Sequence, residues 1–96
     1  MPDLRRYLIC YDIANTKKRN RVVEAVKDFG GVRLQKSVFE CPLNETRLRD
    51  LSSKLGTIID KKTDSIFFTY LCESCRQKRT TLGDITFPRD VEVLIL

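Results

Sequence analysis

The sequence predicts an α+β fold, a two-layer sandwich made of one sheet and two helices. Three segments rich in β-forming residues, at 5–13, 32–41 and 64–72, have the pattern of strands. Two segments between them, at 15–29 and 44–59, carry apolar residues at helical spacing. Alternation of strand and helix segments within 96 residues fits one small domain with a single core.

The first segment, 5–13, has the pattern of a central strand that ends on an acidic residue, Asp12. Successive side chains of a strand point to opposite faces, so apolar residues on both faces indicate a strand with neighbours on both sides. The two sets that alternation separates are Tyr7, Ile9 and Tyr11 on one face and Leu8, Cys10 and Asp12 on the other.

The next segment predicts a helix that begins at a cap formed by Asn15 and Thr16 and runs to about Phe29. Gly30 and Gly31 end it. Its first turns are basic, where the helix dipole disfavours positive charge by about 0.3–1 kcal/mol each. This placement indicates that an anion docks at the helix start. The basic residues are Lys17, Lys18, Arg19 and Arg21, and the apolar stripe is Val22, Val23, Val26 and Phe29.

The segment 32–41 predicts either one bent strand or two strands broken near Ser37. Pro42 is expected to end it, because proline cannot donate to a strand ladder. Asn44 is a suitable cap for a second helix. The apolar face of that helix consists of Leu48, Leu51, Leu55 and then Ile58 or Ile59.

The last part of the chain predicts a core strand at 64–72, a polar and basic loop from Glu73 to Asp84, and a C-terminal strand region within 85–96. Residues 91–96 are strong β-formers, and an unpaired edge of that kind promotes aggregation. They must therefore pair, either within the sheet or with a second copy, and we favour a symmetric homodimer. Together the elements predict a single ferredoxin-like domain over 1–96, a βαββαβ core plus a C-terminal strand.

The net charge of +5 comes entirely from the first part of the chain. Residues 1–39 hold nine Lys or Arg and four Asp or Glu, whereas residues 40–96 hold nine of each. A one-sided basic field attracts polyanions, nucleic acid above all, although a solvated basic surface is the alternative. Histidine is absent, which excludes a histidine base, nucleophile or metal ligand. We expect a cytoplasmic protein without a membrane partner, because neither a signal peptide nor a membrane-length apolar stretch is visible.

The four cysteines predict no metal centre by themselves. Cys72 and Cys75 form a CxxC, which is half of a zinc site at most. The spacing from Cys41 supplies no second half, and Cys10 lies inside the first strand as a small apolar residue. Reduced thiols at a strand end are therefore favoured over a metal or redox role.

Several segments together resemble the Cas-two family of small CRISPR-associated adaptation proteins, over about residues 6–83. The segments are Tyr11-Asp12-Ile13, Arg19-Asn20-Arg21, Arg33 to Glu40 and Asp64-Ser65-Ile66. The resemblance implies a ferredoxin-like two-fold dimer in which Asp12 of each subunit is the metal-site residue. It also implies a magnesium-dependent endonuclease acting on single-stranded RNA or double-stranded DNA, and a bridge between Cas-one integrase dimers during spacer acquisition. By position, the functional residues are Tyr11, Asp12, Arg19, Arg21, Arg33, Ser37 and Phe39.

These residue types suit phosphodiester chemistry. Magnesium takes one or two carboxylates, several waters and a substrate phosphate, so two Asp12 side chains near a dimer axis could hold it. Without the resemblance, Asp12 has the alternative role of a strand-end turn former. The predicted contacts to nucleic acid are phosphate binding by Arg19, Arg21, Arg33 and Ser37, general attraction by Lys17 and Lys18, and either base stacking or core packing by Phe39, with Tyr11 packing beside the site.

Three hypotheses for function follow. The first is a metal-dependent endonuclease, and the second is a non-catalytic nucleic-acid scaffold that docks the integrase. The third is an unrelated ferredoxin-like regulatory dimer that binds a small ligand. The third does not explain the basic excess of residues 1–39. The first two differ only in whether Asp12 matters.

Overall fold

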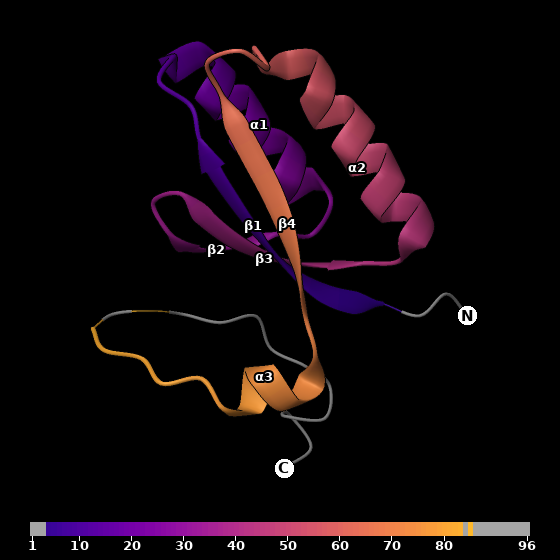
Figure 1. The fold of residues 1–96 in the computed structure, drawn as a ribbon, viewed down its shortest axis with the longest axis vertical. Coiled ribbons are helices and arrows are strands. Elements are labelled where there is room, and N and C mark those ends of the chain that lie inside the picture. The colour runs from indigo at the N-terminus through magenta and orange to yellow at the C-terminus, as the bar shows by residue number, and fades with distance from the viewer. Residues whose placement is uncertain (1–3, 84, 86–96) are drawn as a thin grey trace.

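The computed structural model describes residues 4–83 and residue 85. Four strands form one antiparallel sheet in the order β2-β3-β1-β4, and two long helices pack beside each other against it (Figure 1). The predicted two-layer α+β arrangement is confirmed, with β1 in the centre. The elements are β1 (Arg5–Asp12), α1 (Thr16–Asp28), β2 (Val32–Gln35), β3 (Val38–Leu43), α2 (Glu45–Ile58), β4 (Ser65–Leu71) and α3 (Glu73–Gln77).

The two faces of the sheet differ in what covers them. On the inner face, Ile9 of β1 lies between Phe39 of β3 and Phe68 of β4 in the strand register. This face packs on the helices, and together they bury one core cluster. On the outer face, Cys10 pairs with Val38 and Phe67, and Phe67 is 58% exposed. The buried core is Ile9, Tyr11, Ile13, Val22, Ala25, Val26, Phe39, Cys41, Leu43, Leu51, Leu55 and Ile58.

Helix α1 begins and ends where the sequence predicts. The Asn15 side chain accepts a hydrogen bond of 2.9 Å from the backbone N–H of Lys18, which satisfies one of the free donors at the helix start. At the other end, Gly30 has φ 92°, a conformation that favours glycine, and its N–H bonds to the carbonyl of Lys27. The cap and stop residues therefore set both helix ends.

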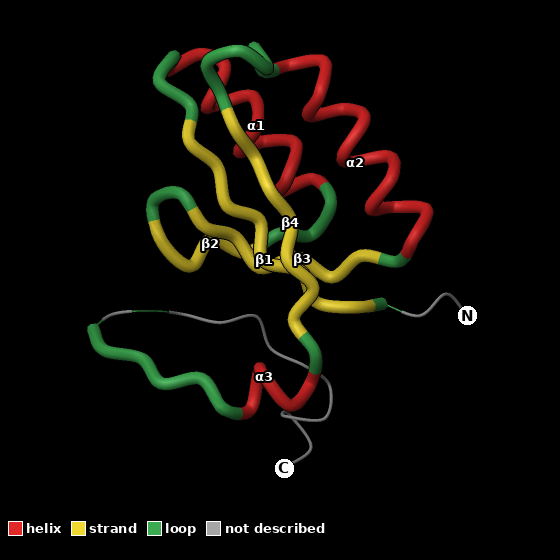
Figure 2. Tube along the Cα trace, viewed as in Figure 1, coloured by secondary structure: helices red, strands yellow, loops and turns green. Residues whose placement is uncertain are grey.

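The segment 32–41 forms two strands, β2 and β3, joined by a tight turn at Lys36 and Ser37 (Figure 2). The prediction that Pro42 ends the strand is wrong, since β3 continues to Leu43 and Pro42 lies opposite Arg6 of β1. The β2 ladder already stops at the Val32–Glu40 pair. A proline is tolerated where one side of a strand carries no ladder bonds.

Helix α2 is capped as predicted, because the Asn44 side chain accepts a hydrogen bond of 2.8 Å from the backbone N–H of Arg47. Both candidates for the end of its apolar face contact the core: Ile58 is buried, and Ile59, the residue after the helix, is partly buried against the cluster. This face closes the core over the inner side of the sheet.

The predicted loop from Glu73 to Asp84 is partly wrong, because Glu73–Gln77 form the short helix α3. The N–H of Arg76 bonds to the carbonyl of Cys72, and the Arg76 and Glu73 side chains form an ion pair at 3.0 Å. The predicted C-terminal strand region 85–96 lies outside the described residues apart from Ile85. None of the helices in the described part of the chain is long and apolar enough to cross a membrane.

Candidate nucleic-acid interface at the end of the first strand

Asp12 is the last residue of β1, and its side chain is exposed on the outer face of the sheet. Ser65, the first residue of β4, lies opposite Asp12 on one side. On the other side, the N–H of Tyr11 bonds to the carbonyl of Ser37 at 3.1 Å. The central strand therefore holds the carboxylate between the start of β4 and the β2–β3 turn.

The described residues of one copy do not form a complete metal site. Among residues 4–83 and 85, no group of three or more cysteine, aspartate or glutamate side chains is arranged to hold a metal ion. Magnesium in proteins takes one or two carboxylates together with several waters and a phosphate, so a single exposed carboxylate is at most part of its ligand set. Asp12 fits such a site if another copy contributes its own Asp12.

Arg19 holds the strand end against the start of α1. Its Nη1 donates to the carbonyl of Ile13 at 3.1 Å, and its Nη2 lies 3.4 Å from the hydroxyl of Thr16. The side chain is half-buried as a result. Arg19 therefore sets the angle at which the basic helix start leaves the strand, and only part of its guanidinium faces solvent.

Arg33 is held in place by two aromatic residues. Its Nη2 donates to the hydroxyl of Tyr11 at 3.3 Å, and its guanidinium lies over the ring of Phe39, 5.4 Å from the centroid. The Tyr11 hydroxyl in turn donates to the carbonyl of Lys36 at 2.7 Å. This chain of contacts fixes an exposed guanidinium beside the β2–β3 turn.

The burial of Phe39 corrects the suggestion that it stacks on a base. Phe39 has no exposed surface, and its ring packs 6.2 Å from that of Tyr11 in the core. Tyr11 is 5% exposed, in keeping with the packing role expected for it. Both residues pack in the core and contact Arg33, and neither presents a ring to a nucleotide.

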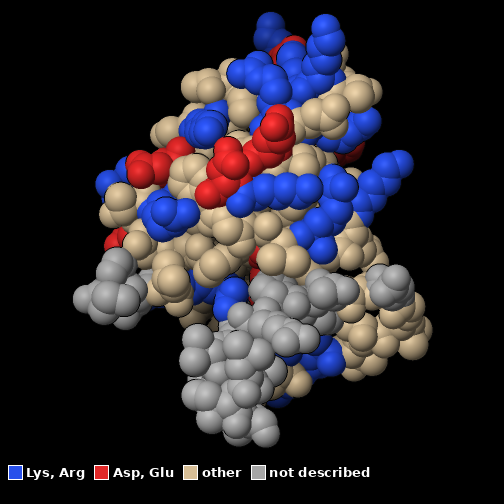
Figure 3. All heavy atoms as spheres, turned by 180° about the vertical axis from the view of Figure 1, so that it is seen from behind, with Lys and Arg blue, Asp and Glu red and all other residues tan. Residues whose placement is uncertain are grey.

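The other predicted contacts are accessible. Lys17, Arg21, Arg33 and Ser37 are exposed, and Lys18 is half-buried. The first turn of α1 contains no acidic residue, so nothing there offsets the cations. Figure 3 shows Lys and Arg side chains spread over the face turned away from the viewer in Figure 1, around a smaller group of acidic side chains. Of these cations, Lys17, Lys18 and Arg21 belong to the start of α1, which follows Asp12 directly at the end of β1, whereas Arg33 is level with Ile9 in the strand register.

Sequence reasoning missed Ser65 and Lys36 as parts of this site. Ser65 lies opposite Asp12, and the Lys36 carbonyl anchors the Tyr11 hydroxyl. Antiparallel register and backbone carbonyl contacts leave no residue-type signal in the sequence. The segment Asp64-Ser65-Ile66 was the nearest available indication.

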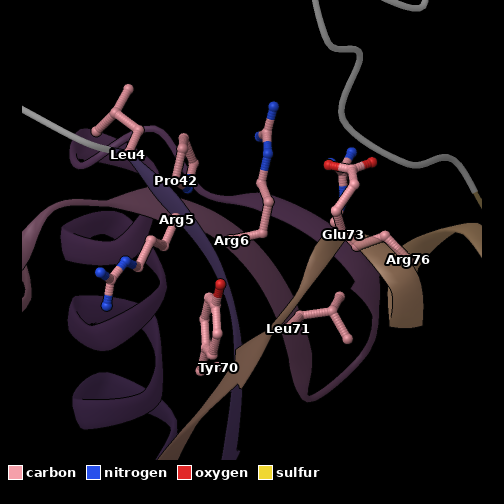
Figure 4. Close-up of a pocket in the computed structure, with 8 residues that line it drawn as sticks. All are labelled: Leu4, Arg5, Arg6, Pro42, Tyr70, Leu71, Glu73 and Arg76. Atoms are coloured by element: carbon pink, nitrogen blue, oxygen red, sulfur yellow. The ribbon is translucent and has the colours of Figure 1, made fainter.

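A hollow in the surface lies at the other end of β1, where the strand begins, and is separate from the candidate site at Asp12. It has a volume of about 260 Å³ and combines arginines with an exposed tyrosine and a glutamate (Figure 4). Arg5 lies over the Tyr70 ring, 5.6 Å from its centroid. The lining residues are Leu4, Arg5, Arg6, Pro42, Tyr70, Leu71, Glu73 and Arg76.

A known protein family matches most of the described chain. The family model described as CRISPR associated protein Cas2 matches residues 5–79, from the first residue of β1 to beyond α3. The chain belongs to the Cas2 family. Family membership leaves the first two hypotheses for function, the endonuclease and the scaffold.

Relatives and solved structures agree with membership of the Cas2 family. The chain is 38% identical over 80 residues to CRISPR-associated endoribonuclease Cas2 4 of Rhodospirillum rubrum. The matched region covers 83% of this chain and 64% of that relative. The chain thus spans just under two thirds of that protein. The crystal structure of Streptococcus pyogenes Cas2 matches with a TM-score of 0.73 and 37% identity, covering 81% of this chain and 99% of that one.

A second solved structure places a Cas2-like chain in an assembly. A chain of a partial Cas6-RT-Cas1–Cas2 complex matches with a TM-score of 0.70 and 28% identity, covering 81% of this chain and 90% of that one. The α+β fold with a four-stranded antiparallel sheet is therefore common to this chain and to Cas2 structures.

Proposed function

We propose that this protein is a CRISPR adaptation protein that binds nucleic acid at the end of β1 and hydrolyses phosphodiester bonds with magnesium. The observation that carries the proposal is the exposed Asp12 carboxylate at the end of β1, followed directly by the exposed cations Lys17 and Arg21 of α1. Curated relatives named endoribonucleases or endonucleases support a nuclease activity.

In this proposal the residues have distinct tasks. Arg21 and Arg33 bind backbone phosphates, because a guanidinium can donate two parallel hydrogen bonds to one phosphate. Lys17 and Lys18 attract the polyanion, and the hydroxyl of Ser37 donates to a phosphate oxygen. Asp12 holds the metal ion. Bound magnesium supplies Lewis-acid polarisation of the phosphoryl group and lowers the pKa of a coordinated water.

A second copy of the chain is part of the proposal. The outer face of the sheet exposes Phe67 and leaves Leu8, Cys10 and Val38 half-buried, which suits burial against an equivalent face. Asp12 lies on the same face, at the end of the central strand β1. A two-fold homodimer formed there would bring a second carboxylate toward the first.

The alternative function is a non-catalytic scaffold that bridges the Cas1 integrase and duplex DNA during spacer acquisition. It is favoured by two observations. Within the described residues of one copy, no group of three or more cysteine, aspartate or glutamate side chains is arranged to hold a metal ion. A solved Cas1–Cas2 assembly contains a chain of the same fold. The two functions share the basic surface and differ in the need for Asp12.

The deciding experiment measures cleavage of single-stranded RNA and of duplex DNA by the purified protein, with magnesium and with chelator. The endonuclease proposal expects magnesium-dependent cleavage that Asp12→Asn abolishes while duplex affinity stays the same. The matched control is Asp50→Asn, an exposed aspartate of α2 away from the site. Cleavage that survives Asp12→Asn, or no cleavage by the wild type, would leave the scaffold as the better account.

A further inference from the structure

The two cysteines that follow β4 are placed to react with each other. Cys72 is the residue that caps α3, and Cys75 lies in its first turn. They are three positions apart at the start of one helical turn, a spacing that places two side chains on the same side of a helix, with Cys75 exposed and Cys72 half-buried. The other two thiols differ, because Cys41 is buried and donates to the carbonyl of Phe29 at 3.4 Å, and Cys10 lies within β1.

The same short segment covers a buried carboxylate. Glu40 of β3 lies opposite Leu8 on the outer face, the face away from α1 and α2, yet it is 0% exposed. Its carboxylate forms ion pairs with Arg79 and with the Nε of Arg76 at 3.6 Å. Figure 1 shows α3 at the end of the sheet away from the start of α1. The ion pairs therefore fasten the chain after β4 to the outer face.

We propose that Cys72 and Cys75 are a reversible dithiol–disulfide site whose oxidation locks the segment 72–79 over Glu40. The site ends at Cys75, one residue before Arg76, so a covalent bond between the two sulfurs restricts the backbone that leads directly into the segment carrying both arginines. This inference is independent of whether Asp12 supports cleavage.

The reaction is thiol–disulfide exchange with a low-molecular-weight disulfide such as glutathione disulfide. Cys72 as thiolate attacks one sulfur, forming a mixed disulfide and expelling one glutathione thiolate, which takes up a proton. Cys75 then attacks the Cys72 sulfur and expels the second glutathione as a thiol. The cysteine pair loses two electrons and two protons, and the glutathione disulfide is reduced to two thiols.

The roles of the two sulfurs follow from their hydrogen bonds. Bonds from the backbone N–H and then the side chain of Cys75 lower the pKa of the Cys72 thiol. The hydrogen bond to Cys72, and the negative charge of its thiolate, raise the pKa of the Cys75 thiol. Cys72 is therefore the attacking thiol and Cys75 the resolving one. Burial, in contrast, raises the pKa of the Cys41 thiol to about 11, which keeps it unreactive.

The first test equilibrates the full chain with mixtures of reduced and oxidised glutathione, alkylates the remaining thiols and maps them by tryptic peptides. Cys72 and Cys75 share the peptide 63–76, whereas Cys10 and Cys41 fall in 7–17 and 37–47. We expect the two thiols of 63–76 to be lost together, leaving two of the four cysteines alkylated. Cys75→Ser should instead accumulate the mixed disulfide with glutathione at Cys72.

Three results of this test would overturn the site. They are simultaneous oxidation of Cys10 or Cys41, disulfides between chains in place of the internal one, and zinc that copurifies with the chain and protects both thiols. The last result would assign the pair to metal binding shared between copies.

The second test asks whether the disulfide locks the segment. Trypsin can cut after Arg76, Lys78 and Arg79, and we expect slower cleavage there in the oxidised protein than in the reduced one. The double variant Cys72→Ser/Cys75→Ser should be cut equally fast under both conditions. Glu40→Gln should still form the disulfide but lose much of the protection. Equal cleavage of oxidised and reduced wild-type protein would refute the lock.

Discussion

At the scale of single residues, the cations near Asp12 divide into those that hold the structure and those that face solvent. Arg19 donates to the carbonyl of Ile13, and Arg33 is held by Tyr11 and Phe39. Arg21 is exposed. All three were predicted to bind phosphate from residue type and from the family resemblance, but only the contacts separate a positioning arginine from a purely surface one.

Arg19→Ala and Arg21→Ala should therefore differ. Arg19→Ala should lower the free energy of unfolding by about 1 kcal/mol, because hydrogen bonds from a charged group to a half-buried carbonyl are lost. Arg21→Ala should leave stability nearly unchanged and reduce the salt dependence of duplex binding by about one phosphate contact. Urea unfolding and binding titrations at several salt concentrations measure both. Equal effects of the two variants on stability would contradict the division.

The Cys41 thiol makes stability depend on alkaline pH. Burial raises its pKa to about 11 from the ordinary 9.0, although nearby Arg47 and Arg6 act in the opposite direction. The unfolded thiol ionises first, so this contribution is full below about pH 9 and is lost as pH rises to about 11, by up to about 1.4 kcal/mol per pH unit. Urea unfolding across this range should show a shallower decline for Cys41→Ala. Parallel pH profiles of the wild type and Cys41→Ala would show that Cys41 contributes nothing to the loss of stability at alkaline pH.

At the scale of elements, local signals and distant contacts contribute differently. The caps at Asn15 and Asn44 and the glycine stop after α1 could be predicted from sequence, because each acts within a few residues. Helix α3 and the course of β3 past Pro42 could not. They depend on Glu40 meeting Arg76 and Arg79 and on where the β2 ladder stops, which are contacts between distant parts of the chain.

The candidate site shows the same division between local features, which the sequence predicts, and contacts between distant residues, which it does not. Asp12 and the basic start of α1 are visible in the sequence because charge and strand pattern are local properties. The burial of Phe39 was left open, since a residue at a strand position can belong to either face until its register is known. Ser65 was missed because only the pairing of β1 with β4 brings it opposite Asp12.

Two glycines should respond in opposite directions to alanine. A Cβ on Gly31 would lie 2.5 Å from Val26 Cγ1 and 2.8 Å from the Val26 carbonyl oxygen, so the backbone must shift and Gly31→Ala should destabilise by about 1–3 kcal/mol. A Cβ on Gly56 meets nothing closer than 4.0 Å within α2, so Gly56→Ala should stabilise by about 0.5–1 kcal/mol. Thermal unfolding of both variants provides the check. A change of the same sign in both would contradict the packing around Gly31.

At the scale of the whole molecule, the sheet has one face covered by helices and one that is covered in part. The segment after β4 covers Glu40, while Phe67 remains 58% exposed and Asp12 lies at the edge. The exposed apolar side chain on the face that also carries Asp12 is the reason why the proposed activity requires two copies.

Phe67→Glu should convert the proposed dimer to a monomer, because two buried charges would face each other across the interface. The matched control is Leu82→Glu, since Leu82 is 90% exposed and lies outside the sheet. Size-exclusion chromatography with light scattering measures the mass. A monomeric wild type, or a Phe67→Glu variant that remains dimeric, would remove this face as the interface. If Phe67→Glu abolished both the dimer and cleavage, the result would show that the proposed cleavage depends on the dimer.

The start of α1 carries positive charge against its own dipole, with Asn15 as its cap and no acidic residue in the first turn. Exchanging Lys17 or Lys18 for glutamate would therefore strengthen the helix by about 0.3–1 kcal/mol at each position. Engineering for heat resistance alone would favour these substitutions early and would remove cations from the surface proposed to attract nucleic acid. Improved thermostability in such a variant is thus a warning of lost binding, and a laboratory selection must score both properties together.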